Sequence, residues 1–148
     1  MYPTEPADSL PIVVLDTNAA LDWLVFGDVG MEPLSRAILG VQLRWVACMR
    51  MRNELERTLA YPALAGRKPD CVRTLTLFER WASPRAAPSA TGFGPLICSD
   101  PDDQVFIDLA VEQGASWLVT RDRALLKLKR RASERGVSIL RPEEWPGA

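Results

Sequence analysis

Apolar positions along the chain follow two spacings, and these spacings predict alternating strands and helices. Short and mostly apolar segments that contain β-branched residues are typical of buried strands, and such segments cover residues 11–15, 43–47, 117–120 and 137–140. Apolar residues at helical spacing predict helices, and these cover residues 18–27, 31–39, 49–61, 69–82, 103–113 and 123–134.

The remaining segments set the limits of the folded part. Residues 83–95 are rich in Pro, Gly and Ser, which predicts a loop. Residues 96–98 are apolar and predict a further strand end before the next helix. Residues 1–11 have neither the basic start nor the apolar centre of a signal peptide, so we expect a flexible lead-in. A single domain over residues 12–145 is therefore expected.

The order of these elements predicts the fold class. Strands that alternate with helices at this spacing are typical of an α/β fold, in which a central parallel sheet carries helices on both faces. No apolar run approaches the length of about 20 residues that a membrane-spanning helix needs. We therefore expect an α/β domain that does not enter a membrane.

The composition excludes several kinds of chemistry. The 148 residues include no histidine, which rules out Ser-His-Asp and Cys-His catalysis and histidine-ligated zinc. The three cysteines are widely spaced, which indicates reduced thiols and a cytoplasmic protein. Any catalysis must depend on carboxylates, hydroxyls, Lys, Arg or a metal bound by oxygen atoms.

Acidic residues follow the predicted strands. Asp16 comes directly after the first strand, Asp103 lies beyond residues 96–98, and Asp122 lies just past the strand 117–120. Because the carboxyl ends of parallel strands meet at one edge of a sheet, these side chains are expected to lie close together. Glu54 lies within a predicted helix, at the margin of its apolar stripe, and can face the same edge.

Each acid also has an ordinary structural explanation. Asp16, Asp103 and Asp122 are suited to cap helices, and Glu54 is placed to pair with Arg50 or Arg57. Together, however, four clustered negative charges must be protonated, paired or bound to a metal. An all-oxygen site favours Mg²⁺ or Mn²⁺, and such ions serve phosphoryl transfer and phosphodiester cleavage.

Four motifs in register resemble the PIN-domain family of ribonucleases. They are V-L-D-T-N-A at 14–19, N-E-L-E-R-T-L at 53–59, D-P-D-D-Q-V-F-I-D-L-A at 100–110 and W-L-V-T-R-D-R-A-L-L at 117–126. The resemblance covers residues 12–142 and is strongest to bacterial toxins of PIN type in toxin–antitoxin pairs. It implies a three-layer α/β/α sandwich with a parallel sheet, and Mg²⁺- or Mn²⁺-dependent cleavage of single-stranded RNA.

The resemblance also implies roles for particular residues. Its catalytic and metal-binding acids fall on Asp16, Glu54, Asp103 and Asp122, with Asp100 and Asp102 as competitors of Asp103. Asn18 and Thr120 fall in supporting positions next to these acids. The basic residues placed to hold the RNA backbone are Arg50, Arg121, Arg123 and Lys127.

Partners and rival functions remain open at this point. The resemblance implies single-stranded RNA as the substrate and an antitoxin protein as a partner, and a homodimer is a further alternative. One rival is a metal-dependent phosphatase or phospho-acceptor domain with Asp16 as the nucleophile. Another is a catalytically inert PIN-fold binding module. The net charge of −1 gives no overall basic character, although basic residues cluster locally around residues 50–57 and 121–135.

Overall fold

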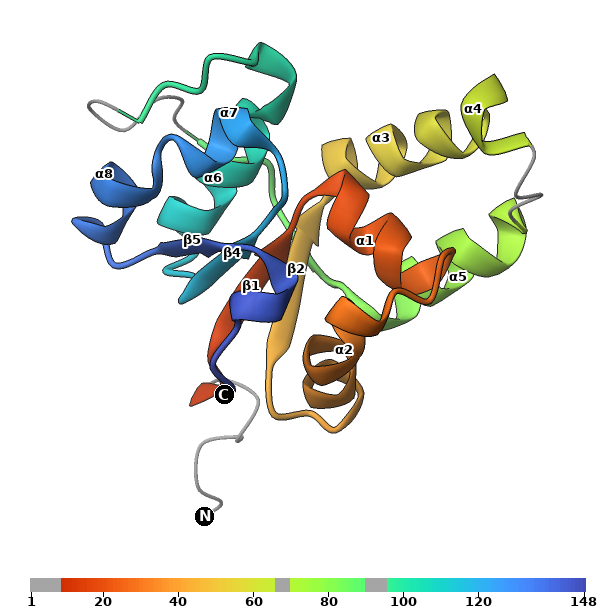
Figure 1. The fold of residues 1–148 in the computed structure, drawn as a ribbon, viewed down its shortest axis with the longest axis horizontal. Coiled ribbons are helices and arrows are strands. Elements are labelled where there is room, and N and C mark those ends of the chain that lie inside the picture. Colours follow the sequence, from red (N-terminus) through yellow and green to blue (C-terminus); the bar gives the residue numbers. More distant parts are fainter. Residues whose placement is uncertain (1–8, 66–69, 90–95) are drawn as a thin grey trace.

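A central parallel sheet organises the molecule in the computed structural model, which describes residues 9–65, 70–89 and 96–148 (Figure 1). All pairings between neighbouring strands are parallel, and the strand order is β3-β2-β1-β4-β5. The strands are β1 (Ile12–Leu15), β2 (Arg44–Cys48), β3 (Ser83–Arg85), β4 (Trp117–Val119) and β5 (Ser138–Leu140).

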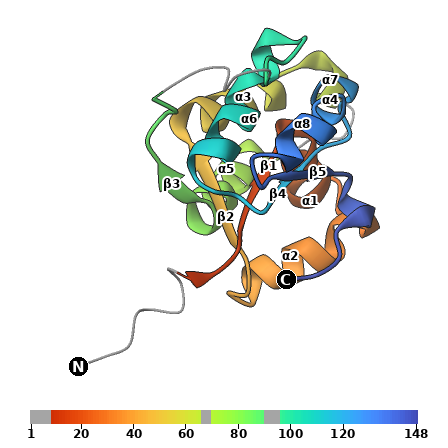
Figure 2. The same cartoon turned by 90° about the vertical axis from the view of Figure 1, so that its left-hand side faces the viewer.

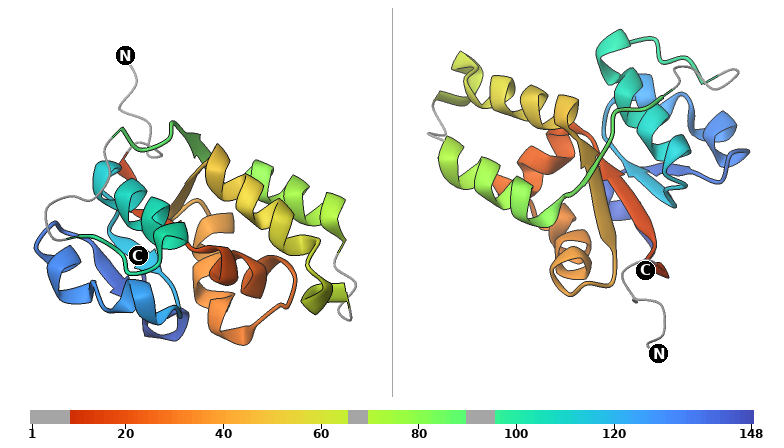
Figure 3. Two further views of the ribbon diagram at one scale, coloured as in Figure 1. Left: turned by 90° about the horizontal axis from the view of Figure 1, so that it is seen from above. Right: turned by 180° about the vertical axis from the view of Figure 1, so that it is seen from behind.

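Helices cover both faces of this sheet, so the three-layer α/β/α prediction is confirmed. The α-helices are α1 (Thr17–Leu24), α2 (Glu32–Leu39), α3 (Met49–Leu59), α4 (Pro62–Ala65), α5 (Cys71–Trp81), α6 (Gln104–Glu112), α7 (Arg123–Leu126) and α8 (Lys129–Ser133). The 3-10 helices that lie wholly within the described residues are η2 (Val29–Met31), η3 (Pro101–Asp103) and η4 (Pro142–Glu144). Helices α1, α2, α3 and α5 lie on one side of the sheet, and α6, α7 and α8 lie on the other (Figures 1 and 3).

This arrangement creates a topological switch point between β1 and β4. The chain leaves β1 toward β2 and β3 through the first group of helices, and it reaches β4 and β5 through the second. Parallel crossovers are right-handed, so the change of direction along the sheet places the two groups on opposite faces. Ligand sites in such sheets form beyond the strand ends at the switch point. Figure 2 shows β1 and β4 side by side at the centre of the sheet.

The core explains why these segments form strands. Val13, Val14 and Leu118 are completely buried because helices cover both faces of the central strands. Trp45 on β2 is 1% exposed and packs edge-on against Phe78 of α5. In the described part of the chain, no helix has the length and hydrophobicity that crossing a membrane requires.

Three details of the sequence-based prediction were wrong. Residues 83–85 form an edge strand and not a loop; Pro84, which lacks an N–H group, is tolerated because this strand pairs only with β2. Residues 96–98 pair with no strand. The single helix expected over 123–134 is divided at Leu128, whose N–H donates to Leu125 O at 2.9 Å; this tight turn lets both leucines enter the core.

The remaining elements lie close to their expected positions. Helix α5 begins at Cys71 because the Asp70 carboxylate accepts the Arg73 N–H at 2.9 Å. The predicted start of this helix at residue 69, the lead-in over residues 1–8 and the loop residues 90–95 lie outside the described residues.

Candidate metal centre

Asp16 occupies the end of β1, directly at the switch point. Its side chain is 4% exposed, and its Oδ1 caps α1 by accepting the Ala19 N–H at 2.8 Å. Its Oδ2 accepts a hydrogen bond from the Thr120 hydroxyl. Burial raises the pKa of the Asp16 carboxyl to about 6, and the two hydrogen bonds only partly oppose this effect.

Thr120 links this carboxylate to the neighbouring strand. It lies just after β4 and is completely buried. While its hydroxyl donates to Asp16, its Oγ1 accepts the Asp122 N–H at 2.9 Å. Asp122 in turn caps α7 by accepting the Ala124 N–H at 2.8 Å. The ends of β1 and β4 are therefore joined by a continuous chain of hydrogen bonds.

Asp103 and Asp100 complete the group from η3. Asp100, Asp103 and Asp122 each offer one carboxylate oxygen within 4.8 Å of the others. Asp103 Oδ2 is buried and accepts no hydrogen bond from any of the described residues. Burial and then the neighbouring Asp122 raise the pKa of the Asp103 carboxyl to about 8.

This donor set fits a hard divalent cation. A buried carboxylate oxygen without a donor is costly, and negative charges this close repel one another. A cation between them would supply the missing partner and relieve the repulsion, and oxygen donors alone suit Mg²⁺ or Mn²⁺. Asp100, Asp103 and Asp122 would hold such an ion, and the negative charge of the nearby Asp16 contributes to the raised pKa of Asp103.

Gln104 holds the η3 side of the site in place. Its Oε1 accepts the Cys98 N–H at 2.7 Å, and its Nε2 donates to Leu96 O and to Asp108 Oδ1, each at 2.9 Å. These bonds give partners to the Cys98 N–H and the Leu96 carbonyl, which no strand of the sheet pairs. The sequence reasoning missed Gln104, although its spacing of four residues from buried Asp108 on a helix is a signal for such a pair.

Besides Asp16 and Thr120, two further predicted site residues, Glu54 and Asn18, lie outside the group of Asp100, Asp103 and Asp122. Glu54 on α3 pairs with Arg57 at 3.1 Å and lines a small hollow of about 30 Å³ together with Asp102. Asn18 is exposed, and the hydrogen bonds described for Asp16 come from Thr120 and Ala19 instead. Of the three acids in this turn, Asp100 and Asp103 face Asp122, whereas Asp102 faces the α3 side. Asp100 and Asp103 are therefore better candidates for metal ligands than Asp102.

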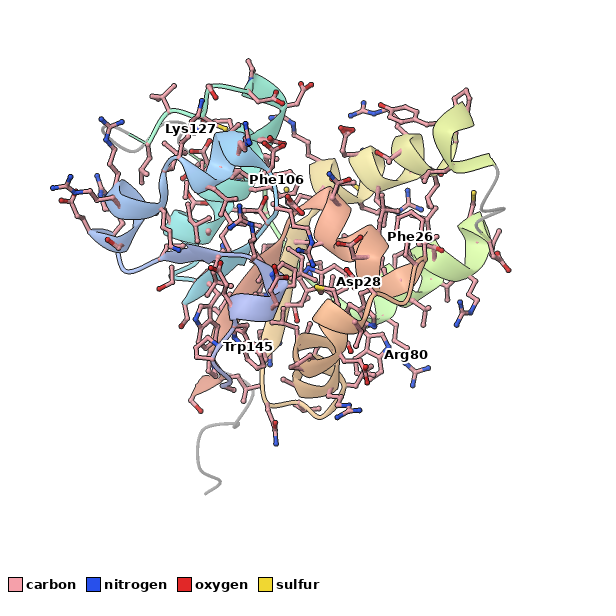
Figure 4. The ribbon with its side chains drawn as sticks, viewed as in Figure 1. Phe26, Asp28, Arg80, Phe106, Lys127 and Trp145 are labelled. Atoms are coloured by element: carbon pink, nitrogen blue, oxygen red, sulfur yellow. The ribbon has the colours of Figure 1, made fainter. Side chains whose placement is uncertain are left out.

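The basic residues divide into two kinds. Arg50, Arg123 and Lys127 are exposed, and Lys127 lies directly after α7 at the surface of the molecule (Figure 4). Arg121 is exposed as well, but unlike these three it is paired with Asp22, Asp28 and Glu143. The four residues predicted to contact RNA are therefore not equivalent, because Arg121 is paired with three carboxylates.

Comparison with known proteins agrees with this architecture. The family model described as "PIN domain" matches residues 12–124. The chain belongs to the PIN-domain family. PIN domains are generally nucleases, and the matched residues include Asp16, Glu54, Asp103 and Asp122.

A solved structure has the same fold as this PIN domain. It is the crystal structure of VapBC2 from Rickettsia felis bound to a DNA fragment from their promoter. The match has a TM-score of 0.56 at 12% identity and covers 86% of this chain and 98% of the matched chain. No curated protein sequence matches significantly.

Proposed function

We propose that this PIN domain is an endoribonuclease that cleaves single-stranded RNA and depends on Mg²⁺ or Mn²⁺. The observation that carries the proposal is the buried, unpartnered Oδ2 of Asp103, in a carboxylate that lies within 4.8 Å of those of Asp100 and Asp122. Carboxylates this close together, without donors to offset their ionisation, are suited to bind a cation. Membership of a family of nucleases supports the same reaction class.

The side chains divide the work between positioning and binding. The proposed direct metal ligands are Asp100, Asp103 and Asp122. Asp16 is the buried carboxylate beside them. Glu54 lies across the small hollow from η3, so we propose that it would contact a bound metal ion through a water molecule. When bound, the divalent ion would activate and orient a water molecule and offset charge on the phosphate.

The reaction is hydrolysis of a phosphodiester. The water oxygen forms the new bond to phosphorus, and the bond to the 3′-oxygen breaks. The products are a 5′-phosphate and a 3′-hydroxyl, and the proton lost by the water is balanced by the one gained at the leaving oxygen. Arg50, Arg123 and Lys127 are exposed cations placed to bind the phosphate backbone.

We further propose that this protein acts in the cytoplasm as the toxin of a toxin–antitoxin pair. The support is the shared fold with VapBC2 from Rickettsia felis. If this chain is a toxin, its expression arrests growth, and an antitoxin encoded beside it relieves the arrest. Expression of the Asp103→Asn variant is the matched control, because it keeps the side-chain size and removes the charge.

Cleavage of labelled single-stranded RNA with Mn²⁺ tests the enzymatic proposal. We expect Asp103→Asn and Asp122→Asn each to lower kcat by at least about 100-fold, since even outer-shell partners of metal ligands cost 10–100-fold. Asp102→Asn is the control, because this neighbouring carboxylate is exposed and lies outside the group of three. Equal activity of Asp103→Asn and Asp102→Asn would contradict the site assignment.

Calorimetry separates the rival functions. We expect Mn²⁺ to bind the wild type at millimolar levels or tighter, and Asp103→Asn to bind it more weakly. A protein that binds no Mn²⁺ and cleaves no RNA would be the inert binding module. Release of phosphate from small phosphoesters without cleavage of RNA would instead favour the phosphatase.

A further inference from the structure

Arg121 occupies a special place in the chain. It lies between Thr120, whose hydroxyl binds Asp16, and Asp122, whose carboxylate belongs to the group of three. Arg121 therefore belongs to the short turn that carries both of these side chains. Any movement of this turn would change the spacing of the carboxylates across the switch point.

Three carboxylates from different parts of the molecule surround the Arg121 guanidinium. Its Nε lies 3.4 Å from Asp22 Oδ2, its Nη2 lies 3.3 Å from Asp28 Oδ2, and its Nη1 lies 2.9 Å from Glu143 Oε1. Asp22 lies on α1, Asp28 caps η2, and Glu143 lies on η4. A planar guanidinium can satisfy several acceptors at once in a fixed fork, whereas a lysine ammonium cannot reproduce this geometry.

The elements that hold Arg121 are themselves anchored. Trp145 follows η4 and packs edge-on against Trp117 at the start of β4, with ring centroids 5.6 Å apart. Asp28 lies beside α1 (Figure 4), and its Oδ1 accepts the Gly30 N–H at 3.1 Å. A Cβ at Gly30 would lie 3.1 Å from Arg121 Nη2, so the η2 turn fits closely against the guanidinium.

This environment is poorly suited to RNA binding. One cation among three carboxylates leaves an excess of negative charge, which repels a phosphate. Arg123, only two residues away on the other side of Asp122, is exposed and forms no ion pair among the described residues. The two arginines that flank Asp122 therefore have different tasks.

We propose that Arg121 is a positioning residue for the candidate metal centre. By binding α1, the η2 cap and η4 together, it holds the Thr120–Asp122 turn so that Asp122 faces Asp100 and Asp103. The role in catalysis rests on the proposed nuclease function. The role in ordering the turn does not, and it can be measured without metal or substrate.

Amide hydrogen exchange of the metal-free protein tests the ordering role. The Asp122 N–H donates to Thr120 and the Ala124 N–H donates to Asp122, so both amides report on the turn. In Arg121→Gln we expect both amides to exchange on the order of tenfold faster, while the amides of β1 stay protected. Arg123→Gln is the matched control, because it removes the same charge next to Asp122 and leaves this exchange unchanged.

The metal readout follows in the same variants. Calorimetry should show Mn²⁺ binding about tenfold weaker in Arg121→Gln, and kcat at saturating RNA should fall about tenfold, as for other residues that orient metal ligands. Arg121→Lys should restore part of both. Glu143→Gln removes one of the three carboxylates and should change exchange in the same direction, which keeps the test available if Arg121→Gln fails to fold.

The outcomes distinguish the two proposals. Unchanged exchange at Asp122 and Ala124 in Arg121→Gln and Glu143→Gln would overturn the positioning role. Unchanged exchange together with weaker RNA binding would identify Arg121 as an RNA contact instead. Faster exchange in a protein whose wild type binds no Mn²⁺ and cleaves no RNA would support the ordering role and contradict the nuclease function.

Discussion

Asp16 and Asp103 belong to the same carboxylate edge, but their surroundings differ. Both oxygens of Asp16 accept hydrogen bonds, one from the Ala19 N–H and one from the Thr120 hydroxyl. Asp103 Oδ2 is buried and accepts no hydrogen bond from the described residues, and Asp122 lies beside it. The β1–β4 half of the site is thus ordered by the protein's own donors, whereas the η3 half lacks such donors, so that Asp103 keeps its proton up to a pKa of about 8.

The difference shows how a fold can prepare a cation site. Hydrogen bonds on the β1–β4 half fix the position of two acids before any ion binds, which reduces the reorganisation needed on binding. The unpartnered oxygen on the η3 half supplies the attraction for a cation, at a cost in stability to the metal-free protein. Order and charge are supplied by different elements of the same edge.

The largest loss of stability should come from breaking the hydrogen-bonded half of the site. Thr120→Val keeps the size of the side chain but leaves Asp16 Oδ2 without a donor and the Asp122 N–H without an acceptor. We expect a loss of about 10–100-fold in RNA cleavage and of about 1–3 kcal/mol in the free energy of unfolding, because buried polar groups lose their partners. Thr120→Ser, which keeps the hydroxyl, is the control, and equal losses in both variants would contradict the role of this hydroxyl.

Neutralising the other half should have the opposite effect on stability. The pKa of Asp103 is raised from 3.8 to about 8 in the folded protein. Between these values the folded state binds more protons than the unfolded state, so stability falls as the pH rises through this window. Asp103→Asn should therefore raise the Tm of the metal-free protein at pH 8 by about 2–4 °C, which corresponds to roughly 1 kcal/mol in a domain of this size.

The pH dependence makes this prediction specific to the η3 half. The gain in Tm should shrink toward pH 4 and vanish below it, where Asp103 is protonated in both states. Asp102→Asn should change the Tm little at either pH. Added Mn²⁺ should stabilise the wild type more than Asp103→Asn, since only binding to the folded state raises stability. A lower Tm for Asp103→Asn at pH 8 would show that the charge is compensated after all.

The acids of the β1–β4 half could be predicted from the sequence, whereas the choice among the three acids of the η3 half could not be settled from it. Asp16 and Asp122 follow apolar strands directly, and parallel strands bring their carboxyl ends to one edge regardless of the details of packing. Asp100, Asp102 and Asp103 lie within four positions of one turn, and a shift of one residue there redirects a side chain. Which of them face Asp122 depends on the backbone path of this turn, and Gln104 next to it is bonded to Leu96 and Cys98.

Arg121 shows a second limit of sequence reasoning. Its basic neighbours made it look like part of a surface that binds RNA. Its partners Asp22, Asp28 and Glu143 are separated from it by 22 to 99 positions in the sequence. Such contacts arise from the folding of η2 and η4 onto α1, and no local periodicity reports them. The edge strand β3 escaped prediction for a related reason, since Ser83–Arg85 gains its structure from β2 alone.

The smallest predicted effect concerns the exposed cations beyond Asp122. Lys127 lies directly after α7 and about one helical turn from Arg123, and it is exposed and has no ion pair among the described residues. In the cleavage-deficient Asp103→Asn background, Lys127→Gln should reduce the slope of log affinity against log salt for single-stranded RNA by about 0.7, the value for one lost phosphate contact. Arg36→Gln on α2, which removes an exposed cation paired with Glu32, should leave the slope unchanged. An unchanged slope in Lys127→Gln would mean that the RNA follows another face, and a slope reduced equally by Arg36→Gln would mean that net charge alone governs binding.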